Sequence, residues 1–215
     1  MKRFLTFLLL LVLPAVTSCD NGNKGGQDPA VRDAIFFGDS ITANWVKDGK
    51  GHPEFFSSNN FLCLGFTGKT TAYMKTLIKG ITDKHPRQLV ILGGTNDIAM
   101  NDGVYVSIEE TRDNIAYMAS EATKAGIKVV ICSVTPSKNF YWAPSVHPEQ
   151  TIVDLNVLLK ALAQEQGYAY ADYHSALVDA GNGLPSQYTS DGCHPNQEGY
   201  TVMEGIILPI LKSNQ

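Results

Sequence analysis

Four short segments of this 215-residue sequence carry side chains that together suit acyl transfer. Ser40 ends the segment AIFFGDS, and a serine becomes a nucleophile when a base takes its proton and nearby donors stabilise the resulting oxyanion. Asp191 precedes His194 by three residues in DGCHP, so the carboxylate can orient an imidazole whose other nitrogen faces a serine. Asn96 in GGTND and the backbone N–H of Gly65 in GFTG are candidate donors to the oxyanion.

The segments around these residues alternate between strand-like and helix-like patterns. Short apolar runs alternate with amphipathic stretches whose apolar residues recur three and four positions apart. This alternation predicts an α/β fold, a three-layer α/β/α sandwich around a five-stranded parallel sheet, with Ser40, Gly65 and Asn96 at its carboxyl edge. The predicted strands are Ala34–Phe37, Phe61–Leu64, Gln88–Leu92, Ile127–Val134 and Tyr168–Ala171, and the predicted helices are Thr70–Ile81, Ser107–Lys124, a helix through Ile152 and Leu162 that ends at Gly167, and one that begins at Pro195-Asn196.

The first thirty residues have the pattern of an export signal followed by a linker. Lys2 and Arg3 precede an apolar run too short to span a bilayer, and the small residues before Cys19 resemble a bacterial lipobox. We therefore predict a lipoprotein signal peptide over residues 1–18, lipidation of Cys19, a flexible tether over 19–30 and one domain over 31–215. Such a protein is anchored to a membrane in the cell envelope of a bacterium, periplasmic or surface-exposed. The alternative is an ordinary signal peptide with a chance cysteine.

Several other kinds of site lack a required residue. The net charge is −4 and no basic cluster occurs, so a nucleic-acid partner is not expected. Gly68-Lys69-Thr70 resembles the end of a phosphate-binding loop, but Cys63 stands where that motif needs glycine. Neither His147 nor the pair Asp191/His194 has the further ligands that zinc needs, and we expect no metal and no cofactor. Three histidines are expected at the surface or in loops: His52, His85 and His174.

Taken in order, these segments resemble the SGNH (GDSL-type) hydrolase family over nearly all of Ala34–Leu211. The family's blocks correspond here to FFGDSIT, LGFTGKT, GGTND and DGCHPN, and Trp45 stands at a spacing common in the platelet-activating-factor-acetylhydrolase-like branch. The resemblance implies a flavodoxin-like fold with strand order 2-1-3-4-5. In that order Cys63 and Cys132 lie on strands separated by two others, about 14 Å apart, so no structural disulfide is expected.

The resemblance also implies a role for each candidate site residue. Ser40 is expected to be the nucleophile, His194 the base and Asp191 the group that orients the base. The oxyanion hole is expected to combine the N–H groups of Ser40 and Gly65 with the side chain of Asn96.

Two positions depart from the pattern of the relatives. Leu64 stands where relatives often have Arg, so any contact made by that Arg is not expected here. Cys193 stands where relatives more often have an apolar residue, and its position beside His194 makes it a rival candidate nucleophile. We favour Ser40, because adjacent residues on a tight turn usually point apart and Ser40 occupies the strand end.

The segment Pro136–Pro148 follows the fourth predicted strand and is therefore expected at the same edge of the sheet. Its three consecutive aromatic residues, Phe140, Tyr141 and Trp142, are predicted to bind substrate by stacking on a sugar ring or an acyl group. The alternative is that they cover the core beneath the loop.

Together these features predict a lipid-anchored serine esterase that removes acetyl or other short acyl groups from carbohydrate through an acyl-enzyme. The expected partners are a small-molecule or glycan ester and, through Cys19, a membrane. Two alternatives are a lysophospholipase or thioesterase with the same triad, and a non-catalytic module that binds acylated glycans.

Overall fold

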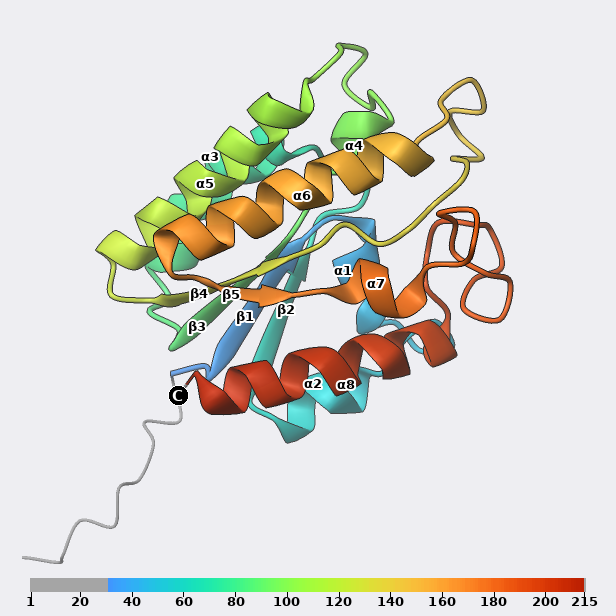
Figure 1. Cartoon of the computed structure of the whole chain (residues 1–215). Helices are drawn as coiled ribbons and strands as arrows, with labels where there is room; N and C mark the ends of the chain where they lie inside the picture. The colour runs from blue at the N-terminus through green and yellow to red at the C-terminus, as the bar shows by residue number, and fades with distance from the viewer. Residues whose placement is uncertain (1–30, 215) are drawn as a thin grey trace, which may run out of the picture.

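The computed structural model describes residues 31–214, which form a five-stranded parallel sheet with helices on both faces (Figure 1). The strands lie in the order β2-β1-β3-β4-β5, so the predicted three-layer sandwich and its strand order are confirmed. The predicted signal peptide, tether and Cys19 lie outside the described residues. The strands are β1 (Ala34–Gly38), β2 (Phe61–Gly65), β3 (Gln88–Leu92), β4 (Lys128–Cys132) and β5 (Ala169–Ala171).

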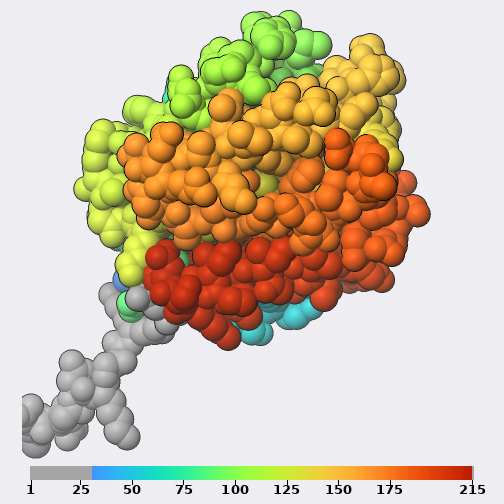
Figure 2. Space-filling model, in the orientation of Figure 1, coloured from blue at the N-terminus to red at the C-terminus, as the bar shows by residue number. Residues whose placement is uncertain are grey.

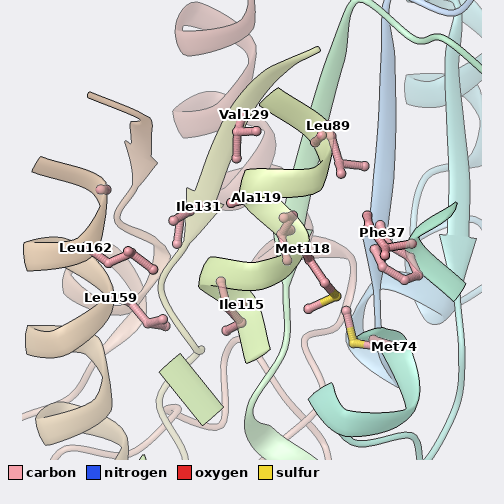
Figure 3. Packing of buried hydrophobic residues seen from close by; sticks show 14 of the residues in the cluster. Phe37, Met74, Leu89, Ile115, Met118, Ala119, Val129, Ile131, Leu159 and Leu162 are labelled. Carbon is pink, nitrogen blue, oxygen red and sulfur yellow. The ribbon is translucent and has the colours of Figure 1, made fainter. Parts of the chain in front are cut away.

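The helices form two layers because successive residues of each strand point to opposite faces of the sheet. Ile35 and Phe37 of β1 contribute to one apolar cluster, whereas Ala34 and Phe36 contribute to the other. Figure 3 shows residues of the first cluster, among them Phe37 of the sheet and the methionines Met74 and Met118 of the helices that cover it. Helices α3 (Thr71–Thr82), α5 (Ile108–Lys124) and α6 (Glu149–Gln166) cover that face, whereas α1 (Ser40–Trp45), α2 (Pro53–Ser58), α7 (Tyr173–Leu177) and α8 (Gln197–Ser213) cover the other, and the short α4 (Thr95–Ile98) follows β3.

Polar side chains fix the starts of the long helices at or near the predicted positions. Ser107 accepts a hydrogen bond from the N–H of Glu110 and is therefore the N-cap of α5. Thr70 and Asn196 cap α3 and α8 in the same way, so both are N-cap residues rather than the first residues of their helices. Figure 2 shows that α6 and α8 make up much of one face of the molecule. In residues 31–214 we find no helix that is both long and apolar enough to cross a bilayer.

The structure corrects three details of the predicted elements. Strand β4 ends at Cys132 rather than Val134, because the N–H and C=O of Val134 bond to the Asn156 side chain (2.7 and 2.9 Å). The short helices α1, α2, α4 and α7 were not predicted. His174 is 9% exposed and belongs to α7, so its expected position at the surface is wrong, and burial lowers its pKa.

Candidate active site

Ser40 is the first residue of α1, and Asp39 alone separates it from the carboxyl end of β1. The chain can turn here because Gly38 has no side chain: a Cβ would lie 2.5 Å from the carbonyl oxygen of Leu92 and would overlap Thr42. Tyr200 of α8 holds α1 in place, since its hydroxyl donates to the carbonyl of Ile41 at 2.6 Å. The position of Ser40 is therefore set by a strand on one side and by the C-terminal helix on the other.

The structure brings Ser40, His194 and Asp191 together in one line of hydrogen bonds. Ser40 Oγ lies 2.9 Å from His194 Nε2, and His194 Nδ1 lies 2.7 Å from Asp191 Oδ2. Because Asp191 can accept at this contact, the imidazole carries its proton on Nδ1 and presents Nε2 to the serine as an acceptor. This is the arrangement in which a histidine can take the proton of a serine hydroxyl.

The turn that carries Asp191 and His194 is held by its own backbone. Asp191 Oδ1 accepts the N–H groups of Cys193 and His194, at 2.9 and 2.8 Å. Burial alone would raise the pKa of Asp191, but these backbone donors and the imidazole lower it below its ordinary value. The hydroxyl of Thr189 closes the turn by donating to the carbonyl of His194 at 2.7 Å. The contact made by Thr189 was not predicted, because no motif in the sequence distinguishes this threonine from others.

Asn96 lies at the start of α4, one residue into the helix after β3. Its NH₂ donates to the carbonyl of Lys69 at 3.1 Å, and its Oδ1 accepts from Asn101 at 2.6 Å. Asn101 in turn accepts from the indole N–H of Trp142 at 2.8 Å. One N–H of the Asn96 amide is left for a ligand, and a chain of hydrogen bonds fixes its orientation. Asn101 is a supporting residue that the sequence alone does not distinguish from a surface asparagine.

Gly65 ends β2 against the helix that carries the nucleophile. A Cβ at this position would overlap the backbone of Ala43, so only glycine lets α1 lie against the strand end. The neighbouring Leu64, where an arginine was expected in relatives, packs against the apolar cluster of α3, α5 and α6. The structure thus places Gly65 beside α1, where its predicted role as an oxyanion donor stays a prediction.

Two carboxyl groups are buried next to this site and do not line it. Asp39 caps α1 by accepting the N–H of Ile41 at 2.9 Å, while its other oxygen has no partner among the described residues. Burial, with a smaller contribution from Asp97, raises the pKa of Asp39 to about 7. Asp97 accepts both the N–H and the hydroxyl of Thr71, and burial raises its pKa as well. We assign both carboxyls to holding helix ends rather than to contact with a ligand.

Two hollows meet at Ser40 and have four lining residues in common: Ser40, Thr67, Tyr141 and His194. The larger, of about 290 Å³, is called the lysine hollow and is further lined by Asn44, Lys47, Lys50, Ser190, Asp191 and Asn196 among others. The smaller, of about 180 Å³, is called the asparagine hollow and is further lined by Gly68, Asn96, Asn101 and Trp142. An ester bond at Ser40 would therefore have one part in each hollow.

The three consecutive aromatic residues have different environments. Phe140 is fully buried with Ala99 and Cys193, so its predicted contact with substrate is wrong and the core-covering alternative applies to it. Tyr141 is 65% exposed and lines both hollows, whereas Trp142 lines the asparagine hollow and lies 5.7 Å from the His194 ring, centroid to centroid. Their role in binding substrate stays a prediction.

Cysteine and metal chemistry have little support at this site. Burial raises the pKa of the Cys193 thiol above its ordinary range, and the side chain points into the cluster with Phe140 rather than into either hollow. Cys63 and Cys132 are free thiols as well. In residues 31–214 no group of three or more His, Cys, Asp and Glu side chains is arranged to hold a metal ion.

Comparison with known proteins agrees with this architecture. Structures of a proposed acylhydrolase from Bacteroides fragilis and a GDSL-like lipase from Bacteroides thetaiotaomicron are 36% and 34% identical to this chain. Each superposes with a TM-score of 0.80 and covers 85% of this chain and 88% of its own. An acetyl xylan esterase, 18% identical, shares the fold with a TM-score of 0.69 over 82% of this chain and 98% of that one.

A curated relative of Bacillus subtilis, the uncharacterized lipoprotein YqeF, is 30% identical over 152 residues, which are 63% of this chain and 58% of that protein. The match thus spans little more than half the length of this relative. The family of GDSL-like lipases and acylhydrolases matches residues 36–202, which hold Ser40, Asn96 and His194. The family match spans most of the described fold, and the two Bacteroides structures share that fold. This chain therefore belongs to the GDSL-like lipase/acylhydrolase family.

Proposed function

We propose that this protein is a serine esterase that hydrolyses acetyl or other short acyl esters on carbohydrate through a Ser40–His194–Asp191 triad. The hydrogen-bonded line from Ser40 Oγ through the imidazole to the Asp191 carboxylate is the observation that carries the proposal. Among residues 31–214, no other serine side chain is hydrogen-bonded to a histidine ring.

The chemistry has two acyl-transfer steps. Ser40 Oγ attacks the ester carbonyl while His194 Nε2 takes its proton, and the negative oxygen is stabilised by the Asn96 amide with backbone N–H groups of Ser40 and Gly65. His194 then gives the proton to the departing alcohol, leaving an acyl group on Ser40. Water, activated by the same imidazole, releases the acid and restores the serine.

The size and lining of the hollows favour a short acyl group on a polar alcohol. The asparagine hollow of about 180 Å³ is smaller than the roughly 300–1,000 Å³ of typical drug-sized ligand sites, so it suits a small acyl group. The lysine hollow is larger and lined mainly by polar residues, and Tyr141 stands exposed between the two, where a sugar ring could stack on it. The fold shared with an acetyl xylan esterase is consistent with this substrate class.

A membrane anchor at Cys19 is the second part of the proposal. The lipobox-like sequence before Cys19 supports it, as does the name lipoprotein borne by the Bacillus subtilis relative. The enzyme would then act in the bacterial cell envelope, held by acyl chains that each contribute about 0.8 kcal/mol per buried CH₂.

Labelling with a fluorophosphonate probe tests whether Ser40 is a nucleophile. Purified protein should be modified at Ser40, and the Ser40→Ala variant should remain unlabelled. Folded wild-type protein without label would favour the glycan-binding alternative. A series of 4-nitrophenyl esters from acetate to palmitate then separates the enzyme classes, because preference for the long chains would favour the lysophospholipase or thioesterase alternative.

A further inference from the structure

The two hollows at Ser40 differ in charge. Apart from the Asp191–His194 pair, the charged residues that line the lysine hollow are Lys47 and Lys50. Asp48 lies between them in sequence and does not line it. The asparagine hollow has no charged lining residue besides His194. The net charge of the whole chain is −4, so a wall with two lysines and the single carboxylate of Asp191 beside the nucleophile runs against the general charge of the protein.

The segment that carries the two lysines is folded tightly against α1 and α8. The carbonyl of Lys47 accepts the N–H groups of both Lys50 and Gly51, each at 3.0 Å. A Cβ at Gly51 would overlap the backbone of Trp45, so glycine is required for this turn. His52 ends the segment by bonding to Glu204 of α8 at 2.9 Å. The backbone of the lysine segment is therefore held at the rim of the hollow, close to where the substrate binds.

The ammonium of Lys47 is also oriented by a buried side chain. Its Nζ donates to Asn44 Oδ1 at 2.8 Å, and Asn44 is 8% exposed in the wall of the lysine hollow. Because an ammonium can only donate, the amide oxygen of Asn44 faces Lys47 and its NH₂ is the group that remains for other partners. The wall thus combines the oriented ammonium of Lys47, the side chain of Lys50 and a neutral donor, all of which suit an anion.

We propose that the lysine hollow selects esters whose larger part, the alcohol, carries an anionic group. This group is either a carboxylate or a phosphate, and Lys47 and Lys50 bind it. The inference rests on the proposed esterase function, because the small asparagine hollow takes the short acyl group and leaves the lysine hollow for the rest of the molecule. The substrate class is then an acetylated acidic sugar, such as a uronic acid or a sugar phosphate, rather than a neutral glycan.

Binding to the Ser40→Ala variant tests this without turnover. Three ligands are compared by calorimetry at low salt: methyl glucoside, methyl glucuronoside and methyl glucoside 6-phosphate, each with an acetyl group on the same hydroxyl. We expect at least one of the two acidic ligands to bind about 3- to 30-fold more tightly than the neutral one, which is the range for two exposed ion pairs. The carboxylate and phosphate arms identify which anion is preferred. The difference should shrink as salt is added.

The lysines are removed in the same background. In Ser40→Ala/Lys47→Gln/Lys50→Gln the acidic and neutral ligands should bind within about twofold of each other. The matched control is Ser40→Ala/Lys84→Gln: Lys84 is exposed between α3 and β3, away from both hollows, and its loss should keep the preference. Equal binding of all three ligands to Ser40→Ala, or a preference that survives loss of both lysines, would overturn the inference.

The outcome is separate from the test of the esterase. If wild-type protein is labelled at Ser40 and cleaves 4-nitrophenyl acetate while the preference is missing, the acidic-substrate inference fails and the proposed function stands. If Ser40 is unreactive while the lysine-dependent preference is present, the lysine hollow is an anion site and the esterase proposal fails.

Discussion

Replacing Asp191 by Asn tests the proposed relay directly, since one oxygen becomes an amide nitrogen and the shape of the side chain is unchanged. Oδ1 of Asp191 accepts two backbone N–H groups, from Cys193 and His194, while Oδ2 faces His194 Nδ1 at 2.7 Å. The two backbone donors require an acceptor, so in the Asp191→Asn protein the NH₂ of the new amide must turn toward the imidazole. The imidazole then carries its proton on Nε2, and Ser40 has no base.

Two energetic losses set the size of the effect. Returning the imidazole to its reactive tautomer places two N–H groups against each other, which costs about 1–3 kcal/mol as an unmet hydrogen bond. The imidazolium formed during catalysis also loses a charge-assisted bond worth about 1.5–3 kcal/mol. The side chains of His194 and Asp191 are 16% and 30% exposed, so solvent screens this contact only in part. At about 1.4 kcal/mol per tenfold change, kcat should fall about 10²- to 10⁴-fold.

The assay is steady-state hydrolysis of 4-nitrophenyl acetate at neutral pH, with thermal unfolding to check the fold. The loss should be in kcat with KM little changed, because the interactions act in the transition state. Asp179→Asn is the matched control: Asp179 also accepts two backbone N–H groups and faces a cation, Lys138, but lines neither hollow at Ser40. That control should keep wild-type kcat. A folded Asp191→Asn protein with kcat within tenfold of wild type would refute the relay.

Four further outcomes are expected. Asn96→Ala should lower kcat about 10²- to 10³-fold, because the oxyanion exists only in the transition state, and a rise in KM alone would assign Asn96 to ground-state binding. Burial raises the pKa of Asp39 from 3.8 to about 7, so the wild-type protein should lose stability, on the order of 4 kcal/mol, as pH rises from about 4 to 7. Asp39→Asn should remove this loss in calorimetry across pH 4–8, and parallel curves for the two proteins would contradict it. Cys193→Ala should keep kcat within a few-fold, whereas inactivity of the folded variant equal to that of Ser40→Ala would make the thiol the nucleophile. Cys19→Ala should move esterase activity from the membrane to the soluble fraction, and its retention on the membrane would contradict lipidation.

The long helices and the strands could be predicted from local patterns in the sequence, but which strands lie next to each other in the sheet could not. Buried apolar runs such as Gln88–Leu92 and caps such as Ser107 have local causes, so the sequence contains them. Strand order depends on which strands pair, and no periodicity encodes pairing. The order β2-β1-β3-β4-β5 was therefore available only through the resemblance to a known family.

The residues of the candidate site could be predicted only in part, because some stand in recognisable segments and others do not. Ser40 and His194 have reactive side chains and stand in segments that the sequence analysis could single out. They meet only because the fold brings together positions far apart in the chain. Lys47 and Lys50 resemble any solvated lysines, and only the turn at Gly51 and the bond to Asn44 place them beside a hollow.

The run Phe140–Trp142 shows the same limit on a smaller scale. Composition alone does not tell which of three adjacent aromatic rings turns inward. The structure places Phe140 in contact with Ala99 and Cys193, at the cost of exposing Tyr141.

The path of the chain also determines how the enzyme sits on anything to which it is attached. The carbonyl of Arg32 accepts from Arg87 just before β3, and the side chain of Asn214 bonds to Gln88 at the start of β3, so residues 31 and 214 lie at the same pole of the sheet. Ser40 lies at the opposite pole, about 17 Å away along β1 at roughly 3.3 Å per residue. Coupling to a resin, a lipid or a fused protein directly at residue 31 or residue 214 would leave Ser40 on the side away from the support. Esters in solution or on neighbouring polymers would reach it readily, whereas esters lying flat in the supporting surface would face the opposite pole when the attachment is short. A flexible linker, such as the tether predicted over residues 19–30, would relax this constraint.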